Sequence, residues 1–224
     1  LFEKSGPAVW ISHLDMMRTI QRCFRRAGIR IKQTEGYSPH AFVSIALPLP
    51  VGTESQCELL DFVLETPVPL SELPTRLNPW MPEGVRVLQA MESDRKIRDL
   101  ARLQAQMTLC YDAGVPADAK IQIEQLLQRE QLLMEKKTKK GTMTELDLLP
   151  MLFASELTEH PKAIVWNVTV SAQNPSLNPE LLIKAKEGRH REIRRCIYCL
   201  NCFTYKSRKN RIPTPGITCT VNPA

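Results

Sequence analysis

Four of the seven cysteines in this 224-residue chain fall near its carboxyl end, and their spacing limits what that end can be. The pattern C-x2-C-x2-C-x16-C groups Cys196, Cys199 and Cys202 and adds Cys219 further along. On a tight loop, thiolates at this spacing converge on one centre, which suits an iron–sulfur cluster or a zinc ion. A disulfide framework or four unrelated buried thiols are the alternatives, and disulfides are rare in a reducing compartment. The spacing therefore predicts a metal centre, with a [4Fe–4S] cluster favoured and zinc as the second choice.

Charge is distributed unevenly along the chain. Residues 181–224 hold ten Lys/Arg against two Asp/Glu, a net charge of +8, whereas the remainder carries −2. We expect the cations of the tail to be solvated or to offset an anionic thiolate cluster, with phosphate binding as the alternative. A body that binds nucleic acid over its whole surface is not supported.

Cellular location is indicated by what the sequence lacks. It has no apolar run of about 18 residues, so we expect no transmembrane helix and no membrane partner. It begins at Leu1 without a basic and apolar leader, which predicts a fragment or processed chain without a secretory signal. Together these features predict a cytoplasmic protein.

Residues 1–92 carry strand and helix signals in the order β-α-β-β-α-β, which predicts a ferredoxin-like unit. Ser12 and Asp15 form a weakened capping box at the start of a helix that Gly28 ends. Apolar residues at three- and four-residue steps predict its buried stripe: Leu14, Met17, Ile20, Phe24 and Ala27. Its arginines fall on another face: Arg18, Arg22, Arg25 and Arg26.

The rest of the chain predicts a second unit and a tail. Residues 93–105 are charged and helix-prone, which indicates a linker, and residues 106–182 follow the order β-α-β-β-β-α. Residues 183–224 are expected to form a Cys-rich and largely irregular segment. The sequence thus predicts an α+β fold with two tandem ferredoxin-like (βαββαβ) units, although no internal repeat is visible.

Two histidines in the first unit, His13 and His40, are candidates for a general base because imidazole titrates near neutrality. The candidate binding residues are Arg18, Arg22, Tyr37 and His40. If both histidines met the arginines at the sheet edge, they would hold a phosphodiester. Alternatively, His13 makes a structural hydrogen bond to the loop and His40 faces solvent.

Five stretches of the first half resemble one known family. They are Phe2-Glu3-Lys4, Ile11-Ser12-His13-Leu14-Asp15, Arg25-Arg26-Ala27-Gly28, Gly36-Tyr37-Ser38-Pro39-His40 and Ala46-Leu47-Pro48-Leu49-Pro50-Val51-Gly52. Residues 1–180 are similar to the radical-SAM-associated domain of unknown function, which bacteria fuse to, or encode beside, a radical-SAM protein. The resemblance implies a radical-SAM partner. At Ala41-Phe42 the family tends to have Pro-Lys, so a cation beside His40 is missing. The helix and loop also look like RNA-processing ferredoxin-like proteins of the CRISPR repeat-endonuclease type, by fold alone.

The tail resembles a second family. The stretches Ile183-Lys184-Ala185-Lys186-Glu187-Gly188-Arg189, Glu192 to Cys202 and Ile217 to Pro223 look like the iron–sulfur segment of old-yellow-enzyme-type reductases such as dienoyl-CoA and enoate reductases. The match implies that the cluster ligands are Cys196, Cys199, Cys202 and Cys219. The last spacer is longer than usual, and residues 1–180 are too short for the flavin-binding barrel of those enzymes, which takes about 250 residues. We therefore expect no FMN or NAD site.

These features predict an accessory protein that binds RNA or substrate for a radical-SAM partner and carries an iron–sulfur cluster in its tail. The C-x3-C-x2-C spacing of radical-generating clusters is absent, so the chain is not expected to cleave S-adenosylmethionine itself. One alternative is an electron-transfer fragment of a flavin-dependent reductase. Another is an RNA endoribonuclease that uses His13 or His40. Whether the chain is an enzyme stays open at this point.

Overall fold

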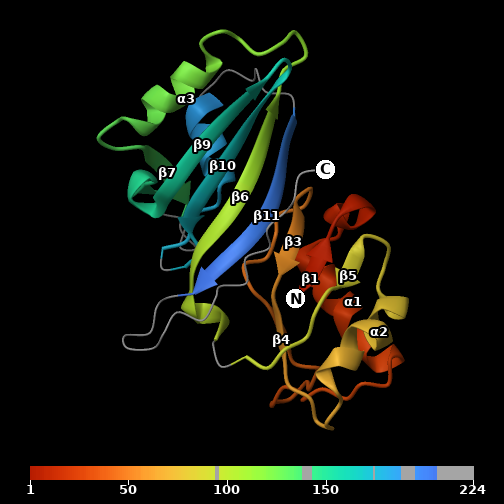
Figure 1. Cartoon of the computed structure of the whole chain (residues 1–224). Helices are drawn as coiled ribbons and strands as arrows, with labels where there is room; N and C mark the ends of the chain where they lie inside the picture. Colours follow the sequence, from red (N-terminus) through yellow and green to blue (C-terminus); the bar gives the residue numbers. More distant parts are fainter. Residues whose placement is uncertain (94–95, 138–142, 174, 188–194, 206–224) are drawn as a thin grey trace, which may run out of the picture. The chain divides into compact units, whose positions relative to one another are not determined.

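The computed structural model describes residues 1–93, 96–137, 143–173, 175–187 and 195–205 (Figure 1). At residues 98, 136–137, 187 and 195–205 it describes the backbone alone. The chain divides into two compact units, Leu1–Asp99 and Leu100–Ala224. Each has its own strands and helices.

The first unit is built on three antiparallel strands in the order β5-β1-β3. A separate pair joins β2 to β4, which follows β3 after one intervening residue. The strands and helices are β1 (Phe2–Lys4), α1 (His13–Arg26), β2 (Val43–Ile45), β3 (Glu54–Glu58), β4 (Leu60–Phe62), α2 (Leu73–Leu77) and β5 (Val85–Val87). Short 3-10 turns lie at Gly6–Trp10, Leu70–Glu72, Asn78–Trp80 and Ile97–Asp99.

Helix α1 packs its apolar face onto this sheet. Its buried residues are Met16, Ile20, Cys23 and Phe24. Of the predicted stripe, Ile20 and Phe24 are buried and Met17 and Ala27 are partly buried, but Leu14 is 65 % exposed. At about 100° per residue, Leu14 lies about 120° around the helix from Ile20, so it leaves the core.

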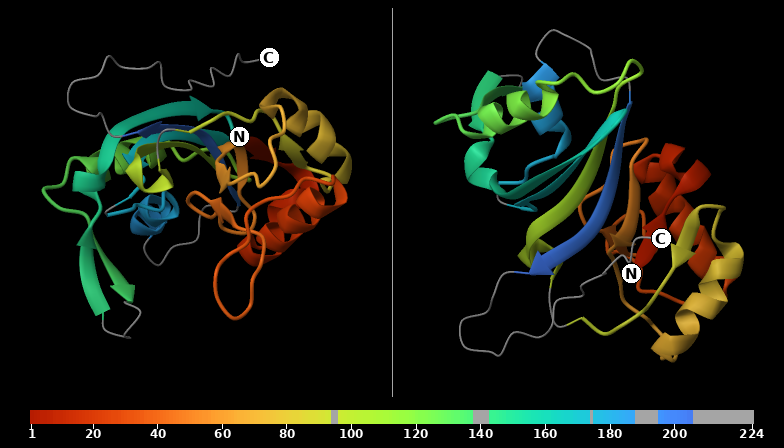
Figure 2. Two further views of the ribbon diagram at one scale, coloured as in Figure 1. Left: turned by 90° about the horizontal axis from the view of Figure 1, so that it is seen from below. Right: turned by 45° about the horizontal axis from the view of Figure 1, so that its top comes forward.

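The second unit has a four-stranded antiparallel sheet in the order β11-β6-β10-β9. Helices α3 and α4 contact each other, and the β7–β8 hairpin projects away from the sheet (Figure 2). The elements are β6 (Leu100–Cys110), α3 (Ala119–Leu127), β7 (Leu133–Lys137), β8 (Met143–Asp147), β9 (Leu152–His160), β10 (Ala163–Ser171), α4 (Glu180–Glu187) and β11 (Arg195–Tyr205). A 3-10 turn, Leu149–Met151, precedes β9.

Strand β6 occupies residues that were expected to form half of a helical linker. The linker prediction is wrong from Leu100 onward, because these residues pair with β10 and β11. Leu103, Ala105, Met107 and Leu109 are buried at every second position, which is the period of a strand. The helix propensity of the local sequence is therefore overridden by pairing with distant strands.

The mixed α and β composition of the fold agrees with the predicted class. Two tandem ferredoxin-like units are not confirmed. In the first unit, the strand expected directly after the first helix is reduced to two isolated bridges, Ile31 to Leu64 and Gln33 to Ala41. In the second, a hairpin is inserted between α3 and β9, and the last strand comes from residues expected to be irregular. Among the described residues, no helix combines the length and apolarity that a membrane span requires.

Candidate functional site

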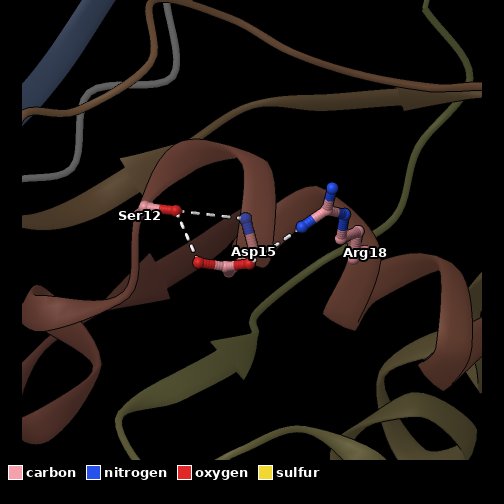
Figure 3. Close-up of polar contacts among 3 residues, drawn as sticks. All are labelled: Ser12, Asp15 and Arg18. Carbon is pink, nitrogen blue, oxygen red and sulfur yellow. Dashed lines mark hydrogen bonds and ion pairs between the residues drawn. The ribbon is translucent and has the colours of Figure 1, made fainter.

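The start of α1 is fixed by its capping residue, and this places the arginines that follow. Ser12 Oγ accepts the Asp15 backbone N–H (3.3 Å) and donates to Asp15 Oδ2 (2.7 Å). Arg18 in turn donates to Asp15 Oδ1 at 3.3 Å (Figure 3). The predicted cap at Ser12 is therefore confirmed. Because Arg18 and Asp15 are both largely exposed, their ion pair contributes little to stability.

Four exposed arginines share one face of α1: Arg18, Arg22, Arg25 and Arg26. At 3.6 residues per turn they fall within about 100° of one another. Arg25 and Arg26 lie in the last turn, where the helix dipole favours cations. Arg22 lies mid-helix without that benefit, and among the described residues it makes no ion pair. Like charges three or four residues apart repel, so this face favours a bound anion.

A loop at residues 33–42 is fastened beside this arginine face. Gln21 Nε2 donates to the Ala41 carbonyl oxygen at 2.8 Å, and Gln21 lies one helical turn from both Arg18 and Arg25. At the base of the loop, the Phe42 N–H donates to the Lys32 carbonyl oxygen at 2.8 Å. Figure 2 shows the loop standing out from the unit. The loop is therefore tied at its base and open at its tip.

Thr34 and His40 close the loop internally. The Thr34 N–H donates to the His40 carbonyl oxygen (2.8 Å), and the His40 N–H donates to Thr34 Oγ1 (3.1 Å). His40 Nδ1 lies 3.1 Å from Thr34 Oγ1 and 3.2 Å from the Ser38 carbonyl oxygen. Tyr37, between them, is fully exposed at 107 %. The loop thus presents an aromatic ring to solvent next to a basic helix.

We call this region the α1–loop surface. It consists of Arg18, Arg22, Arg25, Arg26, Arg30, Lys32, Tyr37 and His40, all exposed. Between residues 18 and 40 the sequence has six Lys/Arg and one Asp/Glu, a net charge of +5. The acidic residue, Glu35, lies 3.8 Å from Lys32. The positive charge of the first unit is therefore concentrated in this stretch, since residues 1–99 as a whole hold twelve Lys/Arg and twelve Asp/Glu.

The predicted binding residues Arg18, Arg22, Tyr37 and His40 all belong to this surface, and the Gln21 contact brings the helix and loop groups together. His13 does not join them. It lies eight residues before Gln21, about 12 Å along the helix axis, and the described residues include no hydrogen bond between His13 and the loop. The described residues therefore give no support to the conditional idea that His13 and His40 meet at the arginines. His40 faces solvent, as the structural alternative expected.

A second unusual site is buried in the sheet of the first unit. Lys4 and Glu58 are only 4 % and 2 % exposed. Thr53 and Ser55, which lie close to Glu58 in the sequence, are also buried. Lys4 Nζ donates to the Ile11 carbonyl oxygen at 3.0 Å. Burial lowers the pKa of Lys4, which the charge of Glu58 partly offsets. Burial likewise raises the pKa of Glu58 to about 7, against the smaller effects of a hydrogen bond from Ser55 and the charge of Lys4.

Sequence reasoning missed this pair. Lys4 has the parity of buried Phe2, so strand alternation places it inward. Alternation does not predict burial of Glu58, because its neighbour Cys57 is buried as well; Glu58 lies opposite Phe2, next to a register shift between β1 and β3. Glu58 Oε1 and Thr53 Oγ1 have no hydrogen-bond partner among the described residues. The arrangement can hold a proton near neutral pH.

The cysteine segment has a different conformation from the one expected. Cys196, Cys199 and Cys202 lie on strand β11, paired opposite Leu109, Gln106 and Gln104, so the predicted tight loop is wrong. Cys219 lies outside the described residues. Where side chains are described, no group of three or more His, Cys, Asp or Glu could hold a metal ion. Ligation by the cysteine quartet stays a prediction.

Comparison with known proteins gives a family but no activity. No curated protein matches the chain. Among solved structures, a chain of a Cbf5-Nop10-Gar1 complex matches at a TM-score of 0.47 and 9 % identity, over 90 % of this chain and 47 % of that one. The present chain thus spans about half the length of that relative. A family model, described as an uncharacterized protein conserved in bacteria (DUF2344), matches residues 1–179. Because the match covers most of the sequence, the chain belongs to the DUF2344 family.

Proposed function

We propose that this protein is a single-stranded RNA-binding accessory protein, and that RNA binds at the α1–loop surface. The observation that carries the proposal is the fastening of a loop with a fully exposed tyrosine to an arginine face that has few ion-pair partners. Clustered arginines neutralise phosphates and release counterions. An exposed aromatic ring stacks on unpaired bases, at about 1–3 kcal/mol per base.

Single-stranded RNA fits this surface better than a duplex does. The cations line one helix and one loop, which suits a flexible backbone that tracks a short basic stripe. Tyr37 offers a stacking face only to bases that are not already stacked in a helix. Specific recognition of RNA typically targets such unpaired bases.

The protein is proposed to bind RNA without cleaving it. The nucleolytic alternative needs two groups that act as acid and base, and the described residues include no hydrogen bond between His13 and the loop that carries His40. The Nδ1 atom of His40 is already within hydrogen-bonding distance of Thr34 and Ser38. RNA recovered intact after prolonged incubation is the expected result.

The radical-SAM partner and the cluster are further parts of the proposal. The partner rests on the motifs of the first half that resemble the radical-SAM-associated domain. The cluster rests on the spacing of Cys196, Cys199, Cys202 and Cys219 and on its resemblance to reductase segments. Iron and sulfide analysis after anaerobic reconstitution, with flavin measured on the same sample, tests the cluster and separates it from a flavin-dependent reductase.

RNA binding is tested by fluorescence anisotropy with a labelled, unstructured RNA of about twelve nucleotides, a site size typical of such surfaces. Arg22→Glu is expected to weaken binding by about tenfold or more, because it replaces a phosphate contact with repulsion. Arg86→Glu is the matched control, since Arg86 is exposed on β5 between the inward-facing residues Val85 and Val87. Tyr37→Ala is expected to lose about tenfold through stacking alone. Equal effects of the two arginine variants would contradict the proposed surface.

A further inference from the structure

The cysteine segment completes the sheet of the second unit. Strand β11 runs antiparallel to β6 from Arg195, opposite Cys110, to Tyr205, opposite Leu100. Its register shifts between Leu200 and Cys202, and again between Thr204 and Tyr205. The pairing therefore covers nearly the whole of β6, whose other edge pairs with β10. Within this unit, the segment is an integral strand of the sheet.

This conformation does not fit a shared metal centre. Cys202 lies six positions after Cys196, and at about 3.3 Å per residue their Cα atoms lie roughly 20 Å apart along the strand. Two cysteines on one zinc ion need Cα atoms within about 10 Å, since each Zn–S bond is about 2.3 Å. A four-iron cluster extends that limit by only a few ångströms. Even with the register shift between Leu200 and Cys202, which shortens the strand slightly, the two requirements disagree by several ångströms.

We infer that metal capture by Cys196, Cys199 and Cys202 releases β11 from β6, so the segment has two mutually exclusive uses. Without metal it is a strand of the sheet, paired with β6. With metal it folds into a compact loop, and each ligating thiol gives up its proton. Zinc binding involves no electron transfer, so this exchange needs no oxidant or reductant. The inference does not depend on RNA binding by the first unit.

Release would leave a specific mark on β6. In an antiparallel sheet, the N–H groups of successive residues point alternately to the two neighbouring strands. Half of the β6 amides therefore bond toward β11 and the other half toward β10. Loss of β11 exposes the first set to exchange and leaves the second set protected. General unfolding of the unit would expose both.

The experiment is residue-resolved amide hydrogen exchange on the full, reduced chain, with and without zinc chloride. With about one equivalent of zinc, alternate amides of Leu100–Cys110 are expected to lose protection by at least tenfold, while the intervening amides keep theirs. A variant with Ser at Cys196, Cys199 and Cys202 should show no zinc-dependent change. The matched control, Cys23→Ser, changes a buried thiol of the first unit and should respond like the parent.

Each other outcome overturns the inference. If zinc binds through the three cysteines while all β6 amides stay protected, ligation and strand pairing coexist. If both sets of β6 amides lose protection together, zinc unfolds the unit and does not release one strand. If no zinc binds, or if the triple variant binds it equally, these cysteines do not capture metal. Zinc uptake is measured on the same samples with a thiolate-sensitive absorbance titration.

Discussion

Replacing Glu58 by Gln tests the buried charge pair of the first unit. Glu58 is 2 % exposed, and burial raises its pKa from 4.5 to about 7. The folded protein thus prefers the protonated carboxyl. Between pH 4.5 and pH 7 the unfolded chain has released this proton and the folded chain has not, so stability must fall as the pH rises.

The change in the free energy of unfolding follows from the size of the Glu58 pKa shift. At 1.36 kcal/mol per pKa unit, this carboxyl stabilises the fold by about 3 kcal/mol below pH 4.5, and the contribution is lost as the pH passes 7. The amide of Gln cannot ionise, so the variant should lack this slope. Its gain above pH 7 will be smaller than 3 kcal/mol, because Lys4 loses a counter-charge. The lowered pKa of Lys4 has the opposite effect on the free energy of unfolding, which it raises as the pH rises toward the ordinary lysine pKa of 10.5.

The assay is urea unfolding followed by far-ultraviolet circular dichroism at pH 5, 6, 7 and 8. We expect the free energy of unfolding of Glu58→Gln, relative to the parent, to rise by about 2–3 kcal/mol from pH 5 to pH 8. Glu65→Gln is the control, because Glu65 is exposed. Parallel pH profiles for the parent and Glu58→Gln would refute the reasoning, and would mean that Glu58 ionises normally in the fold.

Three substitutions test the local structure by urea unfolding. Ser12→Ala removes the acceptor for the Asp15 N–H and should cost about 1 kcal/mol, whereas Ser12→Asp should retain most of the stability. Ser155→Ala leaves the indole N–H of fully buried Trp166 without its acceptor at 2.8 Å, at a cost of about 1–3 kcal/mol; no loss would mean that this bond is not formed. Gly84→Ala should cost about 2 kcal/mol or more, because φ is +83° and a Cβ would clash with the backbone oxygen of Ser5. An unchanged midpoint for Gly84→Ala would show that this turn has another conformation.

The sequence predicted those elements that are determined by interactions between neighbouring residues. The cap at Ser12 and the helix that follows depend on neighbouring residues, and the structure has both. Residues 100–105 were misread because a strand that gains its stability from distant partners carries a weak local signal. Strand β11 carries an equally weak local signal, because its pairing with β6 joins residues that are far apart in the sequence.

The candidate site was predictable only in part. The arginine face and the loop residues can be read from spacing, and the structure adds the Gln21 to Ala41 hydrogen bond that joins them. No local sequence pattern predicts that hydrogen bond, because Gln21 and Ala41 are twenty residues apart in the sequence. The separation of His13 from the loop likewise depends on where the loop meets the helix.

The salt dependence of RNA affinity tests the central claim most directly. If the α1–loop surface binds about three to five phosphates of a single strand, the logarithm of the association constant should fall with the logarithm of salt concentration at a slope of about −2 to −3.5. Arg22→Glu should make that slope shallower by about 0.7, and Arg86→Glu should leave it unchanged. Affinity that does not vary with salt, or a slope that is the same in the parent and Arg22→Glu, would contradict the account.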